Sequence, residues 1–313
     1  MSRPPRLLVL RGGAIGDFIL TLPALNALRE RWPDAHIELA GYPHIAALAR
    51  LGGLADGVSS LDEAGIARLF VPGAALDEPF RDRLRSFDIV LTYLHDPDGV
   101  VRENLRAAGV LQVLYGSPVR PAGHAADHLV RPLEDLALYA AGRAPVLPIA
   151  ADARRAGRER LAALAPPDRA VVLHAGSGSA SKNWPVAGFA AVARALRDAG
   201  RVAVFTRGEA DAALAGALDG AAAAAGARVA GEMELIDLAP LLASAAGYVG
   251  NDSGITHLAA AVGLPVVALF GPTDPDVWGP RGPRVRILRA PGGRLERLGP
   301  EAVLDALRGL GAA

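Results

Sequence analysis

Short apolar runs alternate along the chain with segments in which apolar residues recur every three or four positions. The first run, Arg6–Arg11, has the length of a strand and an apolar centre, as strands buried in parallel sheets do. A glycine-rich turn and a helix to about Arg31 follow it. Further strands are predicted at residues 36–40, 58–61, 87–93 and 110–115, and helices at 42–51, 102–108 and 127–141, with 62–85 irregular. Such alternation predicts a parallel, doubly wound sheet.

The alternation is interrupted between residues 144 and 167, where four prolines surround an Arg- and Ala-rich helix. It then resumes, with strands predicted at 170–174, 202–206, near 229, and at 246–250, 265–270 and 285–288. Helices are predicted at 185–199, 209–218, 235–244, 255–262 and 300–310, and the alanine run 221–225 is expected at a helix end or in a loop. We therefore expect an α/β chain of two Rossmann-like domains, 1–150 and 169–295, facing a central cleft and joined by a linker and connecting helix over 151–168.

Composition narrows the class of protein. The chain has 313 residues, 51% of them hydrophobic, which is ample for two cores. It contains no cysteine, which excludes disulfides and thiolate metal sites and suits a reducing compartment. Its 33 basic and 33 acidic residues balance, so nucleic-acid binding has no electrostatic support. Neither a signal peptide nor an apolar run of the roughly 20 residues needed to span a membrane is visible, so we expect a cytoplasmic protein.

Lys182 is the only lysine in the chain, where all other Lys/Arg positions are arginine. A surviving lysine indicates a site that needs a compact ammonium instead of a planar guanidinium. It lies in a loop of small and hydroxyl-bearing residues that follows a predicted strand and precedes a helix. Close backbone approach plus a point charge is what a phosphate-binding loop requires, with Ser177 as a further candidate contact. The alternative is chance retention of one surface lysine.

A second polar turn, Asn251–Gly254, lies between the strand 246–250 and the helix 255–262. It would aim backbone N–H groups and the positive end of a helix at the carboxyl edge of the sheet. Open α/β sheets bind phosphorylated ligands at this edge. Ser253 and Gly254 can approach a diphosphate closely, and Thr256 and Thr273 can add hydroxyls. The alternative is an ordinary capped βαβ corner.

The first glycine turn partly resembles a dinucleotide-binding fingerprint. Gly12, Gly13 and Gly16 do not have the G-x-G-x-x-G spacing, although Glu38 lies near the end of the second predicted strand. Asp17 follows the last glycine, and a carboxylate there would repel a pyrophosphate. The turn therefore favours the presentation of one carboxylate at the sheet edge over nicotinamide-cofactor binding. The alternative role for Asp17 is helix capping.

Three more residues are candidate donor contacts. Glu209, at the start of a predicted helix, could accept hydrogen bonds from a ribose or stabilise the helix dipole instead. Met233 could pack on a base, although core packing is commoner for methionine. His257 lies one helical turn after Ser253 and could touch a phosphate or be a hydrogen-bonded core histidine.

Three motifs together resemble the heptosyltransferase family of glycosyltransferases, family 9. They are RGGAIGDFILTLPALNALRERWP, HAGSGSASKNWP and GNDSGITHLAAAVGLPVVALFGPTDP, in the family's order and spacing over about residues 6–275. The resemblance implies a GT-B fold whose C-terminal domain binds a nucleotide-activated sugar, typically ADP-heptose, and whose N-terminal domain binds the acceptor. It also implies an inverting reaction without a metal or other cofactor, and a final segment, 296–313, that crosses back to the first domain.

The resemblance also assigns roles to single residues. Asp17 matches the proposed catalytic base, Lys182 the lysine on the donor phosphate and Glu209 the ribose-binding glutamate. The donor motif D-[ST]-G-x-x-H is matched by Asp252, Ser253, Gly254 and His257. The expected partners are a nucleotide sugar and a glycan or glycolipid such as inner-core lipopolysaccharide. We expect a monomer with at most peripheral association with the inner membrane.

The acceptor side is the least defined part of the predicted site. Gly13 and the arginines Arg11, Arg102 and Arg120 lie in or near loops that could meet an anionic acceptor, and solvated surface arginine is the alternative for each arginine. Two other functions stay open: a nucleotide-sugar 2-epimerase with paired Rossmann domains, and a non-catalytic sugar-nucleotide-binding protein. The Asp17 turn and the K-x-W-P loop argue against the epimerase.

Overall fold

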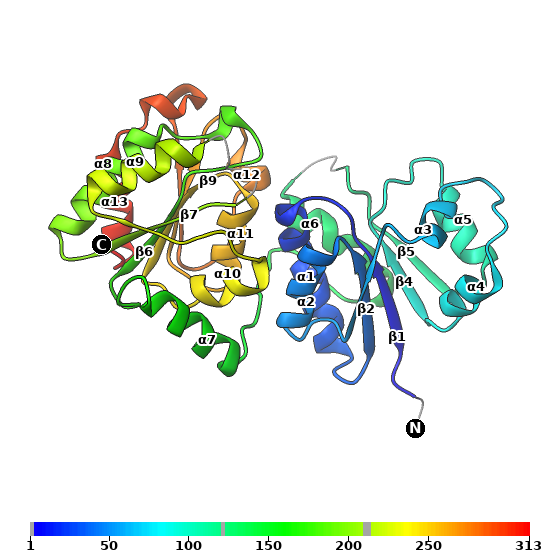
Figure 1. The fold of residues 1–313 in the computed structure, drawn as a ribbon. Helices are drawn as coiled ribbons and strands as arrows, with labels where there is room; N and C mark the ends of the chain where they lie inside the picture. Colours follow the sequence, from blue (N-terminus) through cyan, green and yellow to red (C-terminus); the bar gives the residue numbers. More distant parts are fainter. Residues whose placement is uncertain (1–2, 120–122, 209–213) are drawn as a thin grey trace. The chain divides into compact units, whose positions relative to one another are not determined.

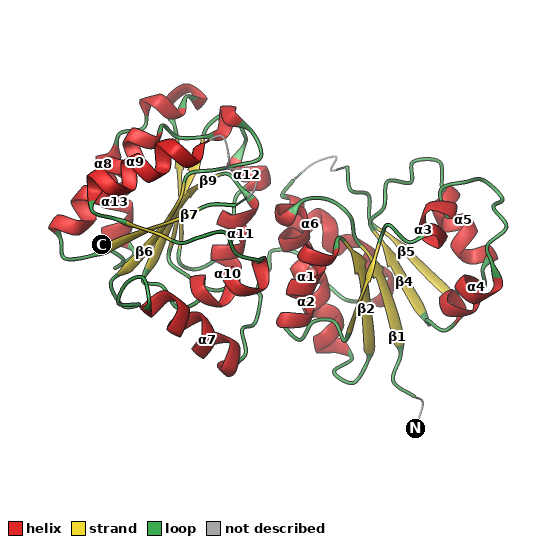
Figure 2. Cartoon of the chain, in the orientation of Figure 1, coloured by secondary structure: helices red, strands yellow, loops and turns green. Residues whose placement is uncertain are grey.

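The computed structural model describes residues 3–119, 123–208 and 214–313. The chain divides into two compact units, Met1–Arg143 and Ala144–Ala313, each built on a parallel sheet with helices on both faces (Figure 2). The predicted class, α/β with two doubly wound Rossmann-like domains, is confirmed. Because the units divide ahead of the predicted linker, the connecting helix belongs to the second unit.

The first unit follows the predicted alternation of strands and helices. In chain order its elements are β1 (Arg6–Leu10), α1 (Ile15–Arg31), β2 (His36–Gly41), α2 (Pro43–Leu51), β3 (Gly57–Ser60), α3 (Ala64–Arg68), α4 (Glu78–Arg85), β4 (Ile89–Thr92), α5 (Val100–Ala107), β5 (Gln112–Tyr115), α6 (Ala125–Val130) and the 3₁₀ helix η1 (Arg131–Leu136). Over the described residues, its sheet has five parallel strands in the order β3-β2-β1-β4-β5.

The first sheet is buried on both faces, which explains why its central strands are continuous apolar runs. α1, α2 and α6 cover one face, and α3, α4 and α5 cover the other (Figure 1). On the second face, Phe80 and Leu84 of α4 and Leu105 of α5 pack on Leu10 and Val90 of the strands. Each such side chain stabilises the fold by roughly 1.5–3 kcal/mol because it leaves water.

The second unit repeats this architecture with one more strand. Its elements are α7 (Ala151–Ala162), β6 (Ala170–His174), η2 (Ala180–Lys182), α8 (Val186–Asp198), β7 (Val202–Thr206), α9 (Ala215–Ala225), β8 (Arg228–Val229), α10 (Leu235–Leu242), β9 (Gly247–Asn251), α11 (Gly254–Ala261), β10 (Val266–Phe270), α12 (Pro275–Trp278), β11 (Val285–Arg289), η4 (Pro291–Gly293), η5 (Leu295–Arg297) and α13 (Pro300–Gly309). In the described part of this unit, six parallel strands are ordered β11-β10-β9-β6-β7-β8, which is the strand order of Rossmann folds.

Across all described ranges, no helix combines the length and apolar content that crossing a lipid bilayer requires.

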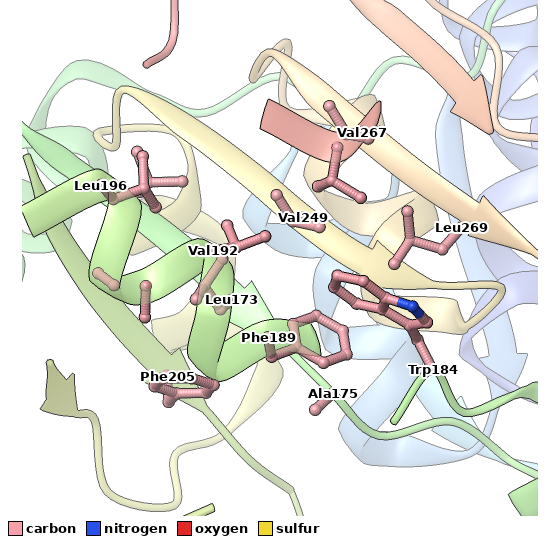
Figure 3. Packing of buried hydrophobic residues seen from close by; sticks show 14 of the residues in the cluster. Leu173, Ala175, Trp184, Phe189, Val192, Leu196, Phe205, Val249, Val267 and Leu269 are labelled. Carbon is pink, nitrogen blue, oxygen red and sulfur yellow. The ribbon is translucent and has the colours of Figure 1, made fainter. Parts of the chain in front are cut away.

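The core of the second unit reaches the loop that carries Lys182. Figure 3 shows Val249 and Leu269 of the strands facing Phe189 of α8 and the indole of Trp184. The rings of Trp184 and Phe189 meet edge to face with centroids 5.0 Å apart. The Trp184 indole N–H donates to the Leu298 carbonyl oxygen at 2.9 Å. The loop is therefore anchored in the core two residues after its lysine.

Two predicted elements of the first unit are wrong. Residues 62–85, predicted as irregular, contain α3 and α4, and Asp77 caps α4 by accepting a hydrogen bond from the Phe80 N–H at 3.0 Å. The helix predicted at 127–141 ends as an α-helix at Val130. Pro132 lacks the N–H that an α-helical bond needs, so the chain continues as η1 until Ala137, whose φ of 55° ends it.

Two expectations for the second unit concern α9 and the final segment. Residues 209–213 of the helix predicted at 209–218 lie outside the described residues, and α9 runs from Ala215 to Ala225. The alanine segment 221–225 therefore forms the C-terminal end of a helix, as expected, because alanine has the highest helix propensity. That the final segment, 296–313, crosses to the first domain stays a prediction; within the second unit, Val303 and Leu307 of α13 are buried in the core. The apolar face of α13 is therefore occupied there, against the strands and α8.

Gly157 allows α7 to pack directly on α10, because a Cβ at this position would lie 2.2 Å from the Pro240 carbonyl carbon. We expect Gly157→Ala to lower the free energy of unfolding of the second unit by roughly 1–3 kcal/mol, since the helices must separate to admit the methyl group. Gly220 in α9 has open space around its Cβ position, so Gly220→Ala should be neutral or stabilising by up to about 1 kcal/mol. Scanning calorimetry compares the two variants, and an unchanged transition temperature for Gly157→Ala would contradict the packing argument.

Candidate functional site

In each sheet the strand order changes direction at one pair of neighbouring strands, β1 and β4 in the first unit and β6 and β9 in the second. Helices that follow such strands leave toward opposite faces, so a crevice forms at the carboxyl edge, where α/β proteins bind ligands. The predicted residues follow these strands: Gly13 and Asp17 after β1, Arg102 after β4, Ser177 and Lys182 after β6, and Asp252, Ser253, Gly254 and His257 after β9. The topology thus gathers them at one edge of each sheet.

Asp17 caps α1 and remains accessible. Its Oδ2 accepts a hydrogen bond from the Ala14 N–H at 2.9 Å, and 42% of its side chain is exposed. Gly13 has a φ of 97°, and a Cβ there would lie 2.7 Å from Asp17 Oδ2. Glycine is therefore required for the carboxylate to fit the turn. The two roles that the sequence left open for Asp17, helix cap and presented carboxylate, are compatible.

Arg11 lies beneath this turn and is 6% exposed. Its Nη2 donates to the Asp17 carbonyl oxygen and its Nε to the Thr21 hydroxyl, both at 2.9 Å, while its guanidinium carbon lies 5.5 Å from the centre of the Tyr93 ring. Burial lowers the pKa of Arg11, and the Asp17 carboxylate, 3.8 Å from Nη2, opposes that shift. The sequence predicted that Arg11 contacts the acceptor substrate. In the structure Arg11 is buried and supports the backbone at Asp17, because a buried cation needs hydrogen-bond partners.

Arg102 is paired with a carboxylate that the sequence analysis missed. Asp96 accepts hydrogen bonds from the Val101 N–H and from Arg102 Nε, each at 3.0 Å, and the Arg102 guanidinium carbon lies 4.4 Å from the centre of the Tyr115 ring. Burial would raise the pKa of Asp96, but these hydrogen bonds and the Arg102 charge lower it below its usual value. Asp96 therefore anchors the N-terminus of α5 as an anion. An acceptor role for Arg102 stays a prediction, and Arg120 lies outside the described residues.

The lone lysine has a buried partner. Lys182 Nζ donates to Asp252 Oδ2 at 2.8 Å, and the Thr273 hydroxyl donates to the same oxygen at 2.7 Å. The side chain of Lys182 is 31% exposed and that of Asp252 is 8% exposed. The pair joins the loops after β6 and β9, and Asp252 restrains the ammonium while leaving it accessible to solvent.

The N-terminus of α11 follows directly after Asp252. Ser253 is its N-cap, and the Ser253 hydroxyl accepts a hydrogen bond from the Thr256 N–H at 3.3 Å. His257 is 5% exposed, and its backbone N–H donates to the Ser253 carbonyl oxygen at 3.2 Å. A partly exposed ammonium together with the positive end of a helix suits a ligand with negative charge. Direct ligand contacts of Ser253, Gly254 and His257 stay predictions.

Asn251 is a part of this site that the sequence analysis did not identify. It is fully buried; its Oδ1 accepts a hydrogen bond from the Trp184 N–H at 3.0 Å, and its Nδ2 donates to the Ala175 carbonyl oxygen at 2.7 Å. These two bonds tie both ends of the lysine loop to the end of β9. The signal in the sequence was an amide that ends an apolar strand, where a buried polar side chain must find partners.

The remaining predicted donor residues have less defined surroundings. The Ser177 hydroxyl lies 2.7 Å from both the Ser179 carbonyl oxygen and Asn183 Oδ1, so it shapes its own loop. Met233 is half-buried just before α10, and Glu209 lies outside the described residues. Among the side chains that the structure describes, no three or more of His, Cys, Asp and Glu gather where they could share a metal ion. Donor roles for these residues stay predictions.

Glu38 argues against binding of a nicotinamide cofactor by the first unit. It lies inside β2, where its carboxylate accepts hydrogen bonds from the Arg83 guanidinium and, at 2.9 Å, from the Ser59 hydroxyl. Burial lowers the pKa of Arg83, but its hydrogen bonds to Glu38 and Glu63 outweigh this and raise it. A carboxylate held in this network is not presented to a ribose at the sheet edge.

We expect Gly13→Ala to destabilise the first unit by about 1–2 kcal/mol and to displace the Asp17 carboxylate, because a methyl group would meet Asp17 and an L-residue disfavours positive φ. Gly12→Ala is the matched control, since a Cβ at Gly12 would lie 3.4 Å from Leu61 Cδ1, an ordinary contact. Urea unfolding compares the two variants. Equal losses of stability would show that the turn does not depend on Gly13.

Comparison with known proteins points to the same family that the three sequence motifs resemble. The family model described as glycosyltransferase family 9 (heptosyltransferase) matches residues 127–304, more than half of the chain. Lipopolysaccharide heptosyltransferase 2 of Escherichia coli (strain K12) is 36% identical over 113 residues, which are 35% of this chain and 32% of that enzyme. The matched stretch thus spans less than half of this curated relative.

Two solved structures share the fold over nearly their whole length. The glycosyl transferase family 9 from Veillonella parvula DSM 2008 has a TM-score of 0.77 at 22% identity, over 98% of this chain and 97% of that one. The E. coli heptosyltransferase WaaC with ADP has a TM-score of 0.74 at 20% identity, over 97% and 99% of the two chains. These likenesses confirm the predicted GT-B fold. The chain belongs to glycosyltransferase family 9, the heptosyltransferase family.

Proposed function

We propose that this chain is an inverting, metal-independent glycosyltransferase that moves heptose from ADP-heptose to a glycan acceptor such as the inner core of lipopolysaccharide. The observation that carries the proposal is the Lys182–Asp252 pair at the carboxyl ends of β6 and β9, beside the N-terminus of α11. A restrained cation and a helix N-terminus are suited to a diphosphate leaving group. The relatives named as lipopolysaccharide heptosyltransferases and the E. coli enzyme with ADP support the choice of donor and acceptor.

In the proposed reaction, Asp17 is the general base. Its carboxylate takes the proton of the acceptor hydroxyl as that oxygen attacks the anomeric carbon of the donor sugar. The bond between this carbon and the diphosphate oxygen breaks, and its electron pair leaves with ADP. Lys182 and the N-terminus of α11 would stabilise the negative charge on the departing diphosphate. A single displacement from the face opposite the leaving group inverts the configuration at the anomeric carbon.

Asp17 is suited to this role by its surroundings. One carboxylate oxygen accepts the Ala14 N–H, and the buried Arg11 guanidinium lies 3.8 Å from the other, so the side chain is held while 42% of it stays exposed. Arg11 and Thr21 both donate hydrogen bonds to the Asp17 carbonyl oxygen, which fixes the backbone of the turn. A base that is held in place can take up the proton of the acceptor hydroxyl without first having to find its orientation.

Two alternative functions predict a different dependence of activity on the acceptor, on Asp17 and on Lys182. An epimerase acting on a nucleotide sugar would convert the donor without any acceptor. A non-catalytic sugar-nucleotide-binding protein would need Lys182 but not Asp17. The proposed lipid-linked acceptor would bring the enzyme to a membrane surface, and peripheral association with the inner membrane stays a prediction.

We expect Asp17→Asn to reduce heptosyl transfer by at least ~10²-fold while ADP affinity stays unchanged, because the amide cannot take the proton but can still cap α1. Transfer from ADP-heptose to a purified inner-core acceptor, followed by mass spectrometry with and without EDTA, measures this effect. Full transfer by the variant would remove Asp17 as the base. Loss of wild-type transfer on addition of EDTA would contradict metal independence.

We expect Lys182→Ala to weaken ADP binding roughly 10- to 100-fold, the size of a lost hydrogen bond to a charged group. Calorimetric titration with ADP, UDP and GDP measures both the loss and the base preference. Arg201→Ala is the matched control, because Arg201 precedes β7 at the opposite edge of the sheet, where it donates to the Asp168 carbonyl oxygen. Unchanged ADP affinity in Lys182→Ala would take the lysine out of the donor site. Normal binding by Lys182→Arg would show that a compact ammonium is not required.

A further inference from the structure

We propose that Thr273 is a positioning residue of the donor site, which acts on Lys182 through the carboxylate of Asp252. This inference rests on the proposed function, since it concerns the site at which the donor diphosphate would bind. Thr273 lies in the turn after β10, while Lys182 lies in the loop after β6 and Asp252 follows β9. Three separate segments of the second unit therefore meet at one carboxylate.

The geometry places both donors on one oxygen. Asp252 Oδ2 accepts the Thr273 hydroxyl at 2.7 Å and Lys182 Nζ at 2.8 Å. A carboxylate bound by the lysine alone could rotate about its last side-chain bond and carry the ammonium with it. The hydroxyl supplies a second, independent anchor from another strand end. The Asp252 carboxylate is 8% exposed, so water competes weakly with these two donors.

The same contact decides what the Thr273 hydroxyl itself does. The sequence indicated that this hydroxyl could bind a diphosphate, but its single proton is directed to Asp252. The lysine ammonium has three N–H donors. Among the described residues, Asp252 accepts a hydrogen bond from one of them. With its direction fixed by Asp252 and Thr273, the ammonium can offer the others to a ligand. Thr273 therefore affects ligand binding by holding Lys182 in place.

The backbone supports this arrangement. The Asp252 N–H donates to the Leu269 carbonyl oxygen of β10 at 3.0 Å, so the ends of β9 and β10 are already in register. Removing the Thr273 hydroxyl would leave the strand pairing intact and free only the carboxylate. Thr273→Val has the shape of threonine without the hydrogen bond, and Thr273→Ser keeps the hydroxyl. This pair of variants separates the hydrogen bond from the packing of the side chain.

The first experiment needs no ligand, because Lys182 is the only lysine in the chain. Protein labelled with ¹⁵N-lysine gives one side-chain ammonium signal in NMR spectra, and a bond to Asp252 slows its exchange with water. We expect that signal to broaden or disappear in Asp252→Asn and in Thr273→Val, and to return in Thr273→Ser. A signal in Thr273→Val with the position and width of the wild type would overturn the inference.

The second experiment measures ADP binding in a double-mutant cycle. We expect Thr273→Val to weaken ADP binding about two- to tenfold, the effect of one lost hydrogen bond. The same change in a Lys182→Met background should have no further effect, because Thr273 acts only through the lysine. An equal loss in both backgrounds would mean that Thr273 touches the ligand or that its loss distorts the site, and would refute the positioning role.

The control for both experiments is Thr92→Val in the first unit, where the hydroxyl accepts a hydrogen bond from the Leu94 N–H at 3.3 Å. It should change neither the lysine signal nor ADP affinity. If the wild-type protein does not bind ADP, the proposed function fails, and the ligand-free NMR result still decides whether Thr273 positions Lys182. If ADP binds and Thr273→Val behaves as the wild type in both experiments, only the inference about Thr273 fails.

Discussion

The lysine loop of the second unit depends on the two hydrogen bonds of one buried amide. Asn251 ends β9, and its side chain holds the Ala175 carbonyl oxygen at one end of the lysine loop and the Trp184 N–H at the other. A buried amide is costly unless its donor and acceptor are both used, so these two hydrogen bonds favour the conformation in which both ends of the loop lie against the end of β9. Because Asp252 is the next residue, the same fixed strand end also places the partner of Lys182.

The first unit uses a related arrangement with the charges exchanged. The buried Arg11 guanidinium follows β1 and supports the turn that presents Asp17, whereas the mostly buried Asp252 carboxylate follows β9 and supports Lys182. In each unit a buried charge next to the end of a central strand holds a more exposed charge of opposite sign. Such pairs are stable only with further hydrogen bonds, which Thr21 and Thr273 supply.

The two units have the same central strand order but differ in chemistry. In the first, Asp17 occupies the N-terminus of α1, so this turn repels anions, and Glu38 is held by Arg83 inside the sheet. In the second, the corresponding edge has a lysine and a serine-capped helix N-terminus, which attract anions. This difference explains why one fold can supply a base from one unit and a donor site from the other, as we propose.

The sequence by itself determined the alternation of strands and helices, the presence of two sheets, and the strand ends at which Asp17, Lys182 and Asp252 lie. These features follow from local patterns, because strand length, turn residues and helix caps are set by neighbours in the chain. Tertiary structure alone decided that Arg11 is buried, that α13 packs in the second unit, and that Asn251 and Thr273 serve the lysine loop. Each of these depends on contacts between residues far apart in sequence, whose partners no local pattern identifies.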